Sequence, residues 1–285
     1  MATFPDELDE LVRRALREDA PSGDLTSEST VPADARCRAE LRAKAEGVLA
    51  GSAAAQAAFE AAAKEDGLGP VEMVWKHGDG DPVSAGDVLA LLSGPARTIL
   101  RAERVAINLL AHLSGVATLT RAFVEAARPA QILCTRKTTP GLRALEREAV
   151  VAGGGSLHRA SLSDAVLIKD NHVRLTGGVG EAVRRAKRDP RRAAVEVEVE
   201  SLAEFEEALA AGADRILLDN PTPDLVRRAA ARVGDPSRLE VSGGVTLESV
   251  SSLVQAGARV ISVGRITHSA PSLDISLEVI DVDRL

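Results

Sequence analysis

Basic side chains gather in two short segments in the middle of a chain whose 285 residues carry a formal net charge of −7. The segment TRKTTPG places Arg136 and Lys137 ahead of hydroxyl side chains and a turn, an arrangement that can cradle an anion. The run GGG further along leads into His158 and Arg159, which together can clamp a carboxylate. A solvated loop explains either segment equally well or better when the segment is taken alone.

Carboxylates alternate with valines in the run VEVEVE at residues 195–200. In a β-strand successive side chains point to opposite faces, so the three glutamates share one face. If the strand belongs to a parallel barrel covered by helices, the valines face the helices and the glutamates face the barrel interior or mouth. Glu198, together with Asp219 at the end of the next apolar run, offers oxygen ligands suited to Mg²⁺. On a half-exposed strand the same glutamates would lie in water.

Lys169 ends another apolar run, in the segment KDNH. An ammonium group at the mouth of a barrel strand is costly to bury unless anions meet it. His172 of the same segment could be no more than a hydrogen-bonded structural group.

Small residues follow two later apolar runs, each ahead of a helical pattern: Ser242, Gly243, Gly244 and Gly264. Backbone N–H groups of such loops commonly bind phosphate at the late strands of a barrel. One such loop is weak support for a phosphate site, and two in succession are stronger. The combined residues predict a site for a phosphorylated or polycarboxylate ligand with Mg²⁺.

These residues lie at the ends of short apolar runs that alternate with helical patterns. The runs are residues 131–135, 165–169, 194–200, 215–219, 239–242 and 260–264, and the clearest helices are 202–211, 224–233 and 247–256. Repeated βα units predict a parallel sheet with right-handed crossovers. An open doubly wound sheet and a barrel both fit this pattern. Polar groups at nearly every C-terminal strand end favour an incomplete TIM-like α/β barrel over a single switch point.

The sequence ahead of these βα units predicts a domain that mixes helices and strands. Helices are expected at residues 5–18 and 52–64, and strands near residues 36–43, 71–77 and 87–93. A long helical pattern then runs from about residue 96 to about residue 127, and a domain boundary is expected within it.

Composition excludes several classes of function. Aromatic residues make up 2% with no tyrosine, which argues against nucleic-acid surfaces that stack bases on aromatic rings. The two cysteines, Cys37 and Cys134, cannot form a disulfide framework, and the apolar neighbours of Cys134 predict a buried thiol. No apolar stretch is expected to span a membrane, and the N-terminus lacks a signal-peptide pattern. The chain is therefore expected to be cytoplasmic.

The order and spacing of several motifs resembles the quinolinate phosphoribosyltransferase family over nearly the whole chain. The motifs are EDAPSGDLTSE, RAERVAINLLAHLSGVAT, TRKTTPGLRALE, GGGSLHR, LIKDNH, VEVEVES, LLDN, SGGV and SVGRITHS. The resemblance implies an N-terminal α/β sandwich domain, residues 1–110, which the segment 271–285 joins, and an α/β barrel phosphoribosyltransferase domain, residues 111–270. It also implies synthesis of nicotinate mononucleotide, pyrophosphate and CO₂ from quinolinate and phosphoribosyl pyrophosphate, in de novo NAD biosynthesis.

The resemblance further implies a homodimer with shared sites, in which Arg104 reaches into the partner's site. It implies that Arg136, His158, Arg159 and Lys169 hold the two carboxylates of quinolinate, that Lys137 lies between the substrates, that Glu198 and Asp219 hold the ribose hydroxyls and Mg²⁺, and that Ser242, Gly243, Gly244 and Gly264 hold phosphates. Lys137, Lys169, Glu198 and Asp219 are the candidate catalytic residues, and no general base is expected. Three positions depart from the family pattern: Leu157 replaces a usual Asn, Glu148 a common aromatic, and Arg265 a usual small residue.

Competing interpretations remain open at this point. One is a phosphoribosyltransferase of the same fold that takes nicotinate or another acceptor, such as the related proteins encoded with molybdate transporters. The KDNH segment and the pair Arg136 and Arg159 favour a dicarboxylate acceptor instead. Another is a barrel lyase or isomerase with Lys169 as a Schiff-base lysine, which leaves the arginines unexplained. A non-enzymatic binding protein would not need the metal-type carboxylates.

Overall fold

The computed structural model describes residues 4–191 and 193–283, and the chain forms two compact units. The first unit combines Met1–Leu119, Thr139–Gly154 and Ser269–Leu285, and the second combines Thr120–Thr138 and Gly155–His268. The domains expected from the sequence placed residues 139–154 in the barrel, whereas the structure packs them in the first unit. The extreme ends of the expected first domain, residues 1–3 and 284–285, lie outside the described residues.

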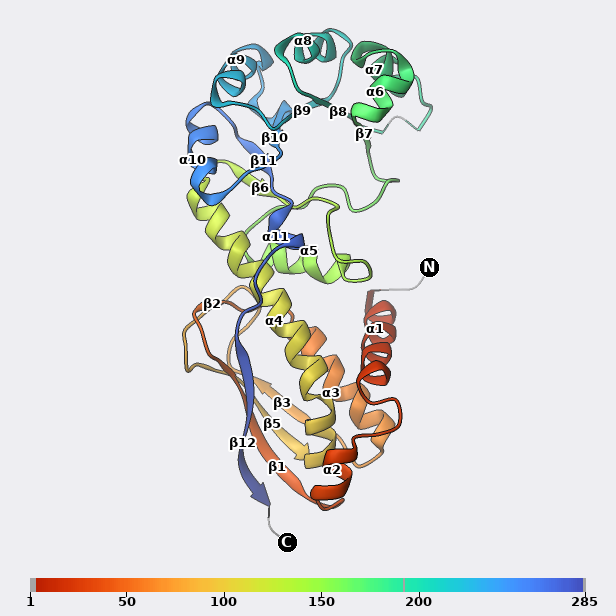
Figure 1. Ribbon diagram of the computed structural model, residues 1–285, viewed down its shortest axis with the longest axis vertical. Coiled ribbons are helices and arrows are strands. Elements are labelled where there is room, and N and C mark those ends of the chain that lie inside the picture. The colour runs from red at the N-terminus through yellow and green to blue at the C-terminus, as the bar shows by residue number, and fades with distance from the viewer. Residues whose placement is uncertain (1–3, 192, 284–285) are drawn as a thin grey trace. The chain divides into compact units, whose positions relative to one another are not determined.

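The first unit is built on an antiparallel sheet with strand order β12-β1-β5-β3. Its strands are β1 (Arg36–Ala43), β3 (Glu72–Trp75), β5 (Val88–Pro95) and β12 (Ile275–Asp283), and its first helices are α1 (Phe4–Asp19), α2 (Leu25–Thr30) and α3 (Ser52–Asp66). A separate short pair joins β2 (Gly47–Val48) to β4 (Pro82–Val83). The last strand, β12, pairs with β1 along its length (Figure 1), so the end of the chain completes this sheet.

The core of the first unit is largely aliphatic because the sequence has few aromatic residues. Leu41 of β1, Leu89 of β5 and Leu16 of α1 are fully buried together with Phe59 of α3. Alternate residues of β1 are buried, as expected for a strand with one covered face. The expected helices and strands of this region are confirmed with small shifts at their ends.

A 31-residue helix, α4 (Ala96–Ala126), carries the chain from the first unit into the second. It corrects the expectation that no apolar stretch could span a membrane, because among the described residues α4 is long and apolar enough by length and composition. Core helices pass the same test, and half of its most apolar stretch is buried. His112 of α4 bonds Glu146 of α5 (Arg143–Ala152) at 2.8 Å, one of the contacts that join residues 139–154 to the first unit.

The second unit is a curved parallel sheet with strand order β6-β11-β10-β9-β8-β7 (Figure 1). Its strands are β6 (Gln131–Leu133), β7 (Val166–Ile168), β8 (Val195–Val199), β9 (Arg215–Asp219), β10 (Leu239–Ser242) and β11 (Val260–Ser262). All five ladders are parallel, and no ladder among the described residues joins β6 to β7. The incomplete barrel expected from the sequence is therefore confirmed.

Helices follow the barrel strands and lie outside the arc that the strands form (Figure 1). They are α6 (Asp170–Thr176), α7 (Val179–Lys187), α8 (Leu202–Ala210), α9 (Pro223–Val233) and α10 (Leu247–Gln255), with a 3₁₀ turn at Pro236–Arg238. The short helix α11 (Arg265–His268) follows β11. Each of three successive helices begins at a hydroxyl N-cap: Ser201, Thr222 and Thr246. These caps fix where each strand–helix loop ends, and the loops carry the polar residues discussed below.

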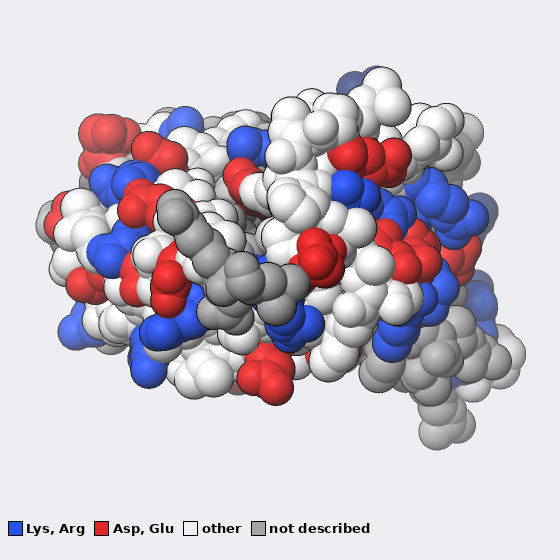
Figure 2. Space-filling view, turned by 90° about the horizontal axis from the view of Figure 1, so that it is seen from below, with Lys and Arg blue, Asp and Glu red and all other residues white. Residues whose placement is uncertain are grey.

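Charged side chains of both signs are interspersed on the face of the molecule shown in Figure 2. Among the residues coloured there, no broad area carries lysine and arginine alone. This mixed face agrees with the presence of both 35 basic and 42 acidic residues in the sequence.

Candidate active site

A cavity of about 370 Å³ opens at the C-terminal ends of the barrel strands. Every residue that lines it belongs to the second unit: Thr135, Arg136, Lys137, His158, Arg159, Leu167, Lys169, Glu198, Leu217, Asp219, Glu240, Ser242 and Ser262. Eight of the residues proposed from the sequence are among them. The cavity therefore brings lysine and arginine side chains and carboxylates into one place, as the strand-end pattern predicted.

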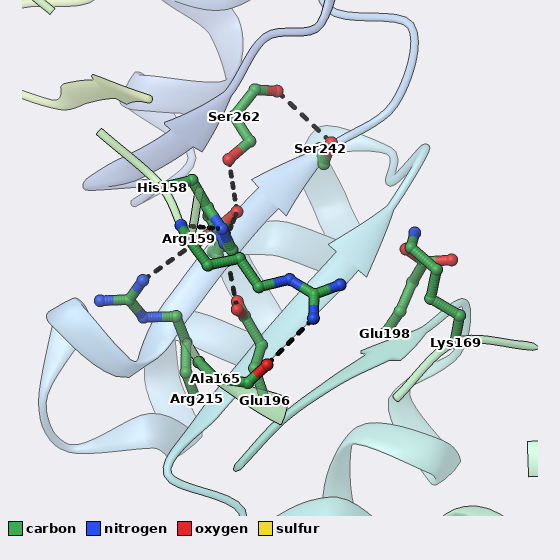
Figure 3. Close-up of polar contacts among 10 residues, drawn as sticks. His158, Arg159, Ala165, Lys169, Glu196, Glu198, Arg215, Ser242 and Ser262 are labelled. Carbon is green, nitrogen blue, oxygen red and sulfur yellow. Dashed lines mark hydrogen bonds and ion pairs between the residues drawn. The ribbon is translucent and has the colours of Figure 1, made fainter. Parts of the chain in front are cut away.

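Lys169 and Glu198 form an ion pair on one side of this cavity (Figure 3). Glu198 comes from β8, whose valines are buried, and Lys169 precedes α6 directly. His172 has the structural role considered for it, because its Nδ1 accepts the backbone N–H of Lys169 at 3.0 Å. The local fold thus fixes the backbone of Lys169, and the Glu198 carboxylate neutralises the charge of its side chain.

Asp219 lies at the end of β9, beside the loop after β10. A Cβ atom added at Gly243 would lie 2.5 Å from Asp219 Oδ1 and 2.6 Å from the backbone nitrogen of Asn220. The φ of Gly243 is +88°, a conformation that side-chain-bearing residues rarely adopt. Glycine is needed here for both reasons, and the loop containing Ser242 and Gly244 consequently packs directly on the Asp219 carboxylate.

Lys137 lies beside the loop after β11. A Cβ atom at Gly264 would lie 3.2 Å from the Cδ atom of Lys137, and Thr267 Oγ1 donates to the Lys137 carbonyl at 2.8 Å. The structure therefore brings two of the expected segments, TRKTTPG and SVGR, side by side at adjacent strands of the sheet.

His158 lies between two buried carboxylates, Glu196 (Figure 3) and Glu240, which were not predicted from the sequence as site residues. Its Nε2 lies 3.2 Å from Glu196 Oε2 and 3.5 Å from Glu240 Oε1. The Ser262 hydroxyl donates to Glu240, and the Arg215 guanidinium lies 3.3 Å from the same carboxyl. The alternation within VEVEVE identifies Glu196 as inward-facing, but a single glutamate in LEVS gave no comparable signal for Glu240.

Burial sets the protonation of this cluster. It raises the pKa of Glu240 to about 7, and the nearby Glu196 charge acts in the same direction. The hydrogen bond to Glu196 raises the pKa of His158, and burial of the ring opposes that effect. His158, Glu196 and Glu240 each offer a ligand atom within 4.8 Å of the others, so they form a second set of possible metal donors besides Glu198 and Asp219.

Arg159 is held at both ends. Its backbone N–H donates to His158 Nδ1 at 2.8 Å, and its guanidinium donates to the Ala165 carbonyl at 3.0 Å (Figure 3). Burial lowers the pKa of Arg159, and the charge of Arg136 lowers it further. Two guanidinium groups close enough to repel each other create a place where an anion is stabilised.

Four expected site residues do not line this cavity: Gly243, Gly244 and Gly264, which lie in loops beside it, and Arg104. Its side chain is 63% exposed on α4 and lines a different cavity, of about 450 Å³, within the first unit. Asn108 and Asp274 line that cavity as well.

The three departures from the family pattern lie at exposed positions. Leu157 is 44% exposed and lines a third cavity, of about 310 Å³, at the other side of His158. Glu148 is exposed on α5, where burial of part of its carboxyl raises its pKa. Arg265 is exposed at the start of α11.

Known proteins resemble this chain along nearly its entire length. A relative from Bacillus subtilis, called probable nicotinate-nucleotide pyrophosphorylase [carboxylating], is 43% identical over 96% of this chain and 93% of its own. A relative of the same name from Methanothermobacter thermautotrophicus is 39% identical over 95% of this chain and 98% of its own. The solved nicotinate-nucleotide pyrophosphorylase from Francisella tularensis is 35% identical, covers 98% of both chains and has a TM-score of 0.90.

Two family models match successive parts of the chain. The N-terminal domain of quinolinate phosphoribosyl transferase matches residues 24–114, and the C-terminal domain matches residues 116–278. The two matches meet inside α4. The chain belongs to the quinolinate phosphoribosyl transferase family.

Proposed function

We propose that the chain catalyses the carboxylating nicotinate-nucleotide pyrophosphorylase reaction in de novo NAD biosynthesis. Read toward synthesis, quinolinate and phosphoribosyl pyrophosphate become nicotinate mononucleotide, pyrophosphate and CO₂. The observation that carries the proposal is the cavity at the strand ends, in which four lysine and arginine side chains meet the carboxylates of Glu198 and Asp219. An otherwise acidic protein gathers these cations where two polyanionic substrates would meet.

The acceptor is assigned to the cationic side of the cavity. Arg136, Arg159 and Lys169 hold the two carboxylates of quinolinate, with His158 in the same wall. Charge-assisted hydrogen bonds from arginine are strong and directional, so these groups can orient the pyridine ring as well as attract it. Orientation and electrostatics carry the catalysis, because the ring nitrogen itself is the nucleophile.

The donor is assigned to the opposite side. Lys137 lies beside Gly264 and faces the leaving pyrophosphate, while Ser242, Gly243, Gly244 and Gly264 offer backbone N–H groups to phosphate. The bond between ribose C1 and pyrophosphate breaks as Lys137 offsets the growing negative charge. The acceptor nitrogen then bonds to C1 and becomes positively charged, and that charge stabilises the electron pair left on the ring when CO₂ departs. The ring carbon then takes up a proton from water to give nicotinate mononucleotide.

Glu198 and Asp219 suit Mg²⁺ as the cofactor. Carboxylate oxygens are the ligands that this ion prefers, and both line the cavity on neighbouring strands, β8 and β9. Magnesium would supply positive charge for the pyrophosphate and ribose oxygens. The cluster of His158, Glu196 and Glu240 fits less well, because Glu196 Oε2 already faces His158 and the two Glu240 oxygens already face Ser262 and Arg215.

A homodimer with shared sites accompanies this assignment, and Arg104 of a second copy completes the acceptor site. The exposed guanidinium on α4 supports this role, because its one ion-pair neighbour among the described residues is Glu103, at 3.9 Å. The proposed compartment is the cytoplasm, which two buried cysteine thiols suit.

Turnover tests the activity directly. The full chain is incubated with quinolinate, phosphoribosyl pyrophosphate and Mg²⁺, and both nicotinate mononucleotide and CO₂ are followed beside a parallel reaction with nicotinate. Both products from quinolinate, with nicotinate inert, are the expected result. Lys169→Met should abolish them, while Lys76→Met, at an exposed lysine of the first unit, should not. Turnover of nicotinate alone would assign the chain to the rival acceptor class.

Hybrid dimers test the shared site. Arg104→Ala and Lys169→Ala chains are each expected to be inactive, and mixing them after dissociation should restore part of the activity. A fully active Arg104→Ala protein would contradict the role of Arg104.

A further inference from the structure

Lys137 lies in a stretch of backbone that belongs to no helix or strand. It is exposed in the irregular segment between β6 and α5, and among the described residues two hydrogen bonds hold its backbone. Its N–H donates to the Thr135 hydroxyl at 3.0 Å, and its carbonyl accepts a hydrogen bond from the Thr267 hydroxyl at 2.8 Å. An exposed lysine loses much rotamer freedom when it is ordered. The position of Lys137 therefore depends on these few contacts.

Thr267 is a buried residue that supplies one of these two bonds from far along the chain. It is 1% exposed in α11 and is not among the residues that line the candidate active-site cavity. Its Oγ1 lies 2.8 Å from the Lys137 carbonyl oxygen and 3.0 Å from the Gly264 carbonyl oxygen. A hydroxyl has one proton, so it can donate fully to only one of the two.

The Gly264 carbonyl is satisfied without this hydroxyl. It already accepts the backbone N–H groups of Thr267 and His268, each at 3.2 Å. No other donor among the described residues reaches the Lys137 carbonyl, and the Thr267 hydroxyl is nearer to it. An unpaired carbonyl costs more than a carbonyl that gives up one of three donors. The hydroxyl proton is therefore assigned to the bond with Lys137.

The side chain of Lys137 is in contact with the same helix. A Cβ atom added at Gly264 would lie 3.2 Å from Lys137 Cδ and 3.3 Å from His268 Nε2, so the lysine side chain packs against the α-carbon of Gly264. The ladder between β6 and β11 brings the two segments to this point. Thr267 is bonded to both, through its backbone N–H to Gly264 and through its hydroxyl to Lys137. One buried residue thus fixes the lysine against the loop whose N–H groups are assigned to phosphate.

We propose that Thr267 is a positioning residue for Lys137, whose ammonium group it holds where the pyrophosphate end of the donor binds. This inference rests on the proposed function for its ligand. It adds to the site a residue of the SVGRITHS motif that would touch neither substrate. The alternative is a local role, because threonine hydroxyls in helices often bond a carbonyl three or four residues earlier, here that of Gly264.

Isosteric substitution separates the two roles. Thr267→Val keeps the shape of the side chain and removes the hydroxyl, whereas Thr267→Ser keeps the hydroxyl and removes a methyl group. We expect KM for phosphoribosyl pyrophosphate to rise about tenfold in the valine variant and to stay within about threefold of the parent in the serine variant, because one hydrogen bond changes an equilibrium by roughly tenfold. KM for quinolinate should change in neither. Thr267→Ala, a second variant without the hydroxyl, should behave as the valine variant does.

Thr98→Val is the matched control for removing a buried hydroxyl. Thr98 is fully buried in α4, and its hydroxyl has no hydrogen-bond partner among the described residues. Its variant should keep the kinetic constants of the parent. Equal effects of the valine and serine substitutions at Thr267, or equal rises in the KM values of both substrates, would show that Thr267 only stabilises the fold and would refute the proposal.

A double-mutant cycle on donor binding tests whether the effect passes through Lys137. Phosphoribosyl pyrophosphate is titrated calorimetrically into each protein in the presence of Mg²⁺ and without quinolinate. We expect Thr267→Val to weaken binding about tenfold in the parent but less than about twofold in the Lys137→Met background, because residues that act together are not additive. The same loss in both backgrounds, or no loss in either, would overturn the proposal. A parent protein that bound no phosphoribosyl pyrophosphate would overturn the proposed function itself, so the two failures are distinguishable.

Discussion

Gly243→Ala is expected to damage the candidate site while leaving the barrel folded. The new Cβ atom would lie 2.5 Å from Asp219 Oδ1, and ordinary contacts begin near 3.4 Å, so the carboxylate or the loop must move by roughly 0.9 Å. The positive φ of +88° adds strain of about 1–2 kcal/mol for a residue with a side chain. Overpacking typically adds about 1–3 kcal/mol, which is enough to displace a surface loop.

A displacement near 1 Å at a catalytic group can cost about 100-fold in rate. We therefore expect kcat/KM for phosphoribosyl pyrophosphate, at saturating quinolinate and Mg²⁺, to fall by about 100-fold in Gly243→Ala. Gly244→Ala is the matched control, because its Cβ would lie 3.2 Å from Asn220 Oδ1, at the far end of a side chain. With a φ of +58°, its loss should stay below about tenfold.

The two proteins are compared by steady-state kinetics and by thermal unfolding followed with circular dichroism. Equal midpoints with unequal activities would place the effect at the site. If Gly243→Ala retained the parental kcat/KM, the position of Asp219 would not matter for donor binding, and its assignment as a magnesium and ribose ligand would be wrong.

Three further outcomes follow from the structure. Gly115→Ala should cost roughly 1–2 kcal/mol of stability and lower the unfolding midpoint by a few degrees, because its Cβ would lie 2.1 Å from the Pro271 carbonyl oxygen. Gly78→Ala is the control and should leave the midpoint unchanged, because its Cβ would make only an ordinary contact at 3.6 Å. Glu198→Gln should reduce kcat/KM by about 100-fold without changing the unfolding midpoint. Glu200→Gln, at an exposed position, is its control. Similar activities of the two variants would show that Glu198 has a structural role and does not act in the site. The raised pKa of Glu240, about 7 against an ordinary 4.5, gives stability that is full below 4.5 and is lost as pH rises through 7. Glu240→Gln should flatten the midpoint against pH across this window, and parallel curves for the two proteins would contradict the shift.

Periodicity predicted most of the fold because each element has a clear pattern of burial. The long helix was expected from about residue 96 to about residue 127 and spans Ala96–Ala126. The strand with alternating valines and glutamates was expected at residues 194–200 and spans Val195–Val199. Its third glutamate, Glu200, lies past the end of the strand and is exposed, because the capping box of Ser201 and Glu204 starts α8 there.

Residues 139–154 show where the sequence was insufficient. Their membership in the first unit depends on long-range contacts, including the bond between His112 and Glu146, and local periodicity contains no information about such pairs. Glu240 was missed for a related reason. One glutamate in a four-residue strand has no alternation to reveal its face, and only the approach of His158, Arg215 and Ser262 from separate segments explains its burial.

The pairing of β12 with β1 has a consequence for how the protein is made. β1 leaves the ribosome early, but the strand that covers its outer edge is translated only after the whole second unit. Throughout that interval one edge of β1 presents unpaired backbone N–H and C=O groups, which can pair with another nascent chain. A translation pause or a premature stop before Ile275 would therefore leave a complete barrel attached to a sheet with an exposed, aggregation-prone edge at β1.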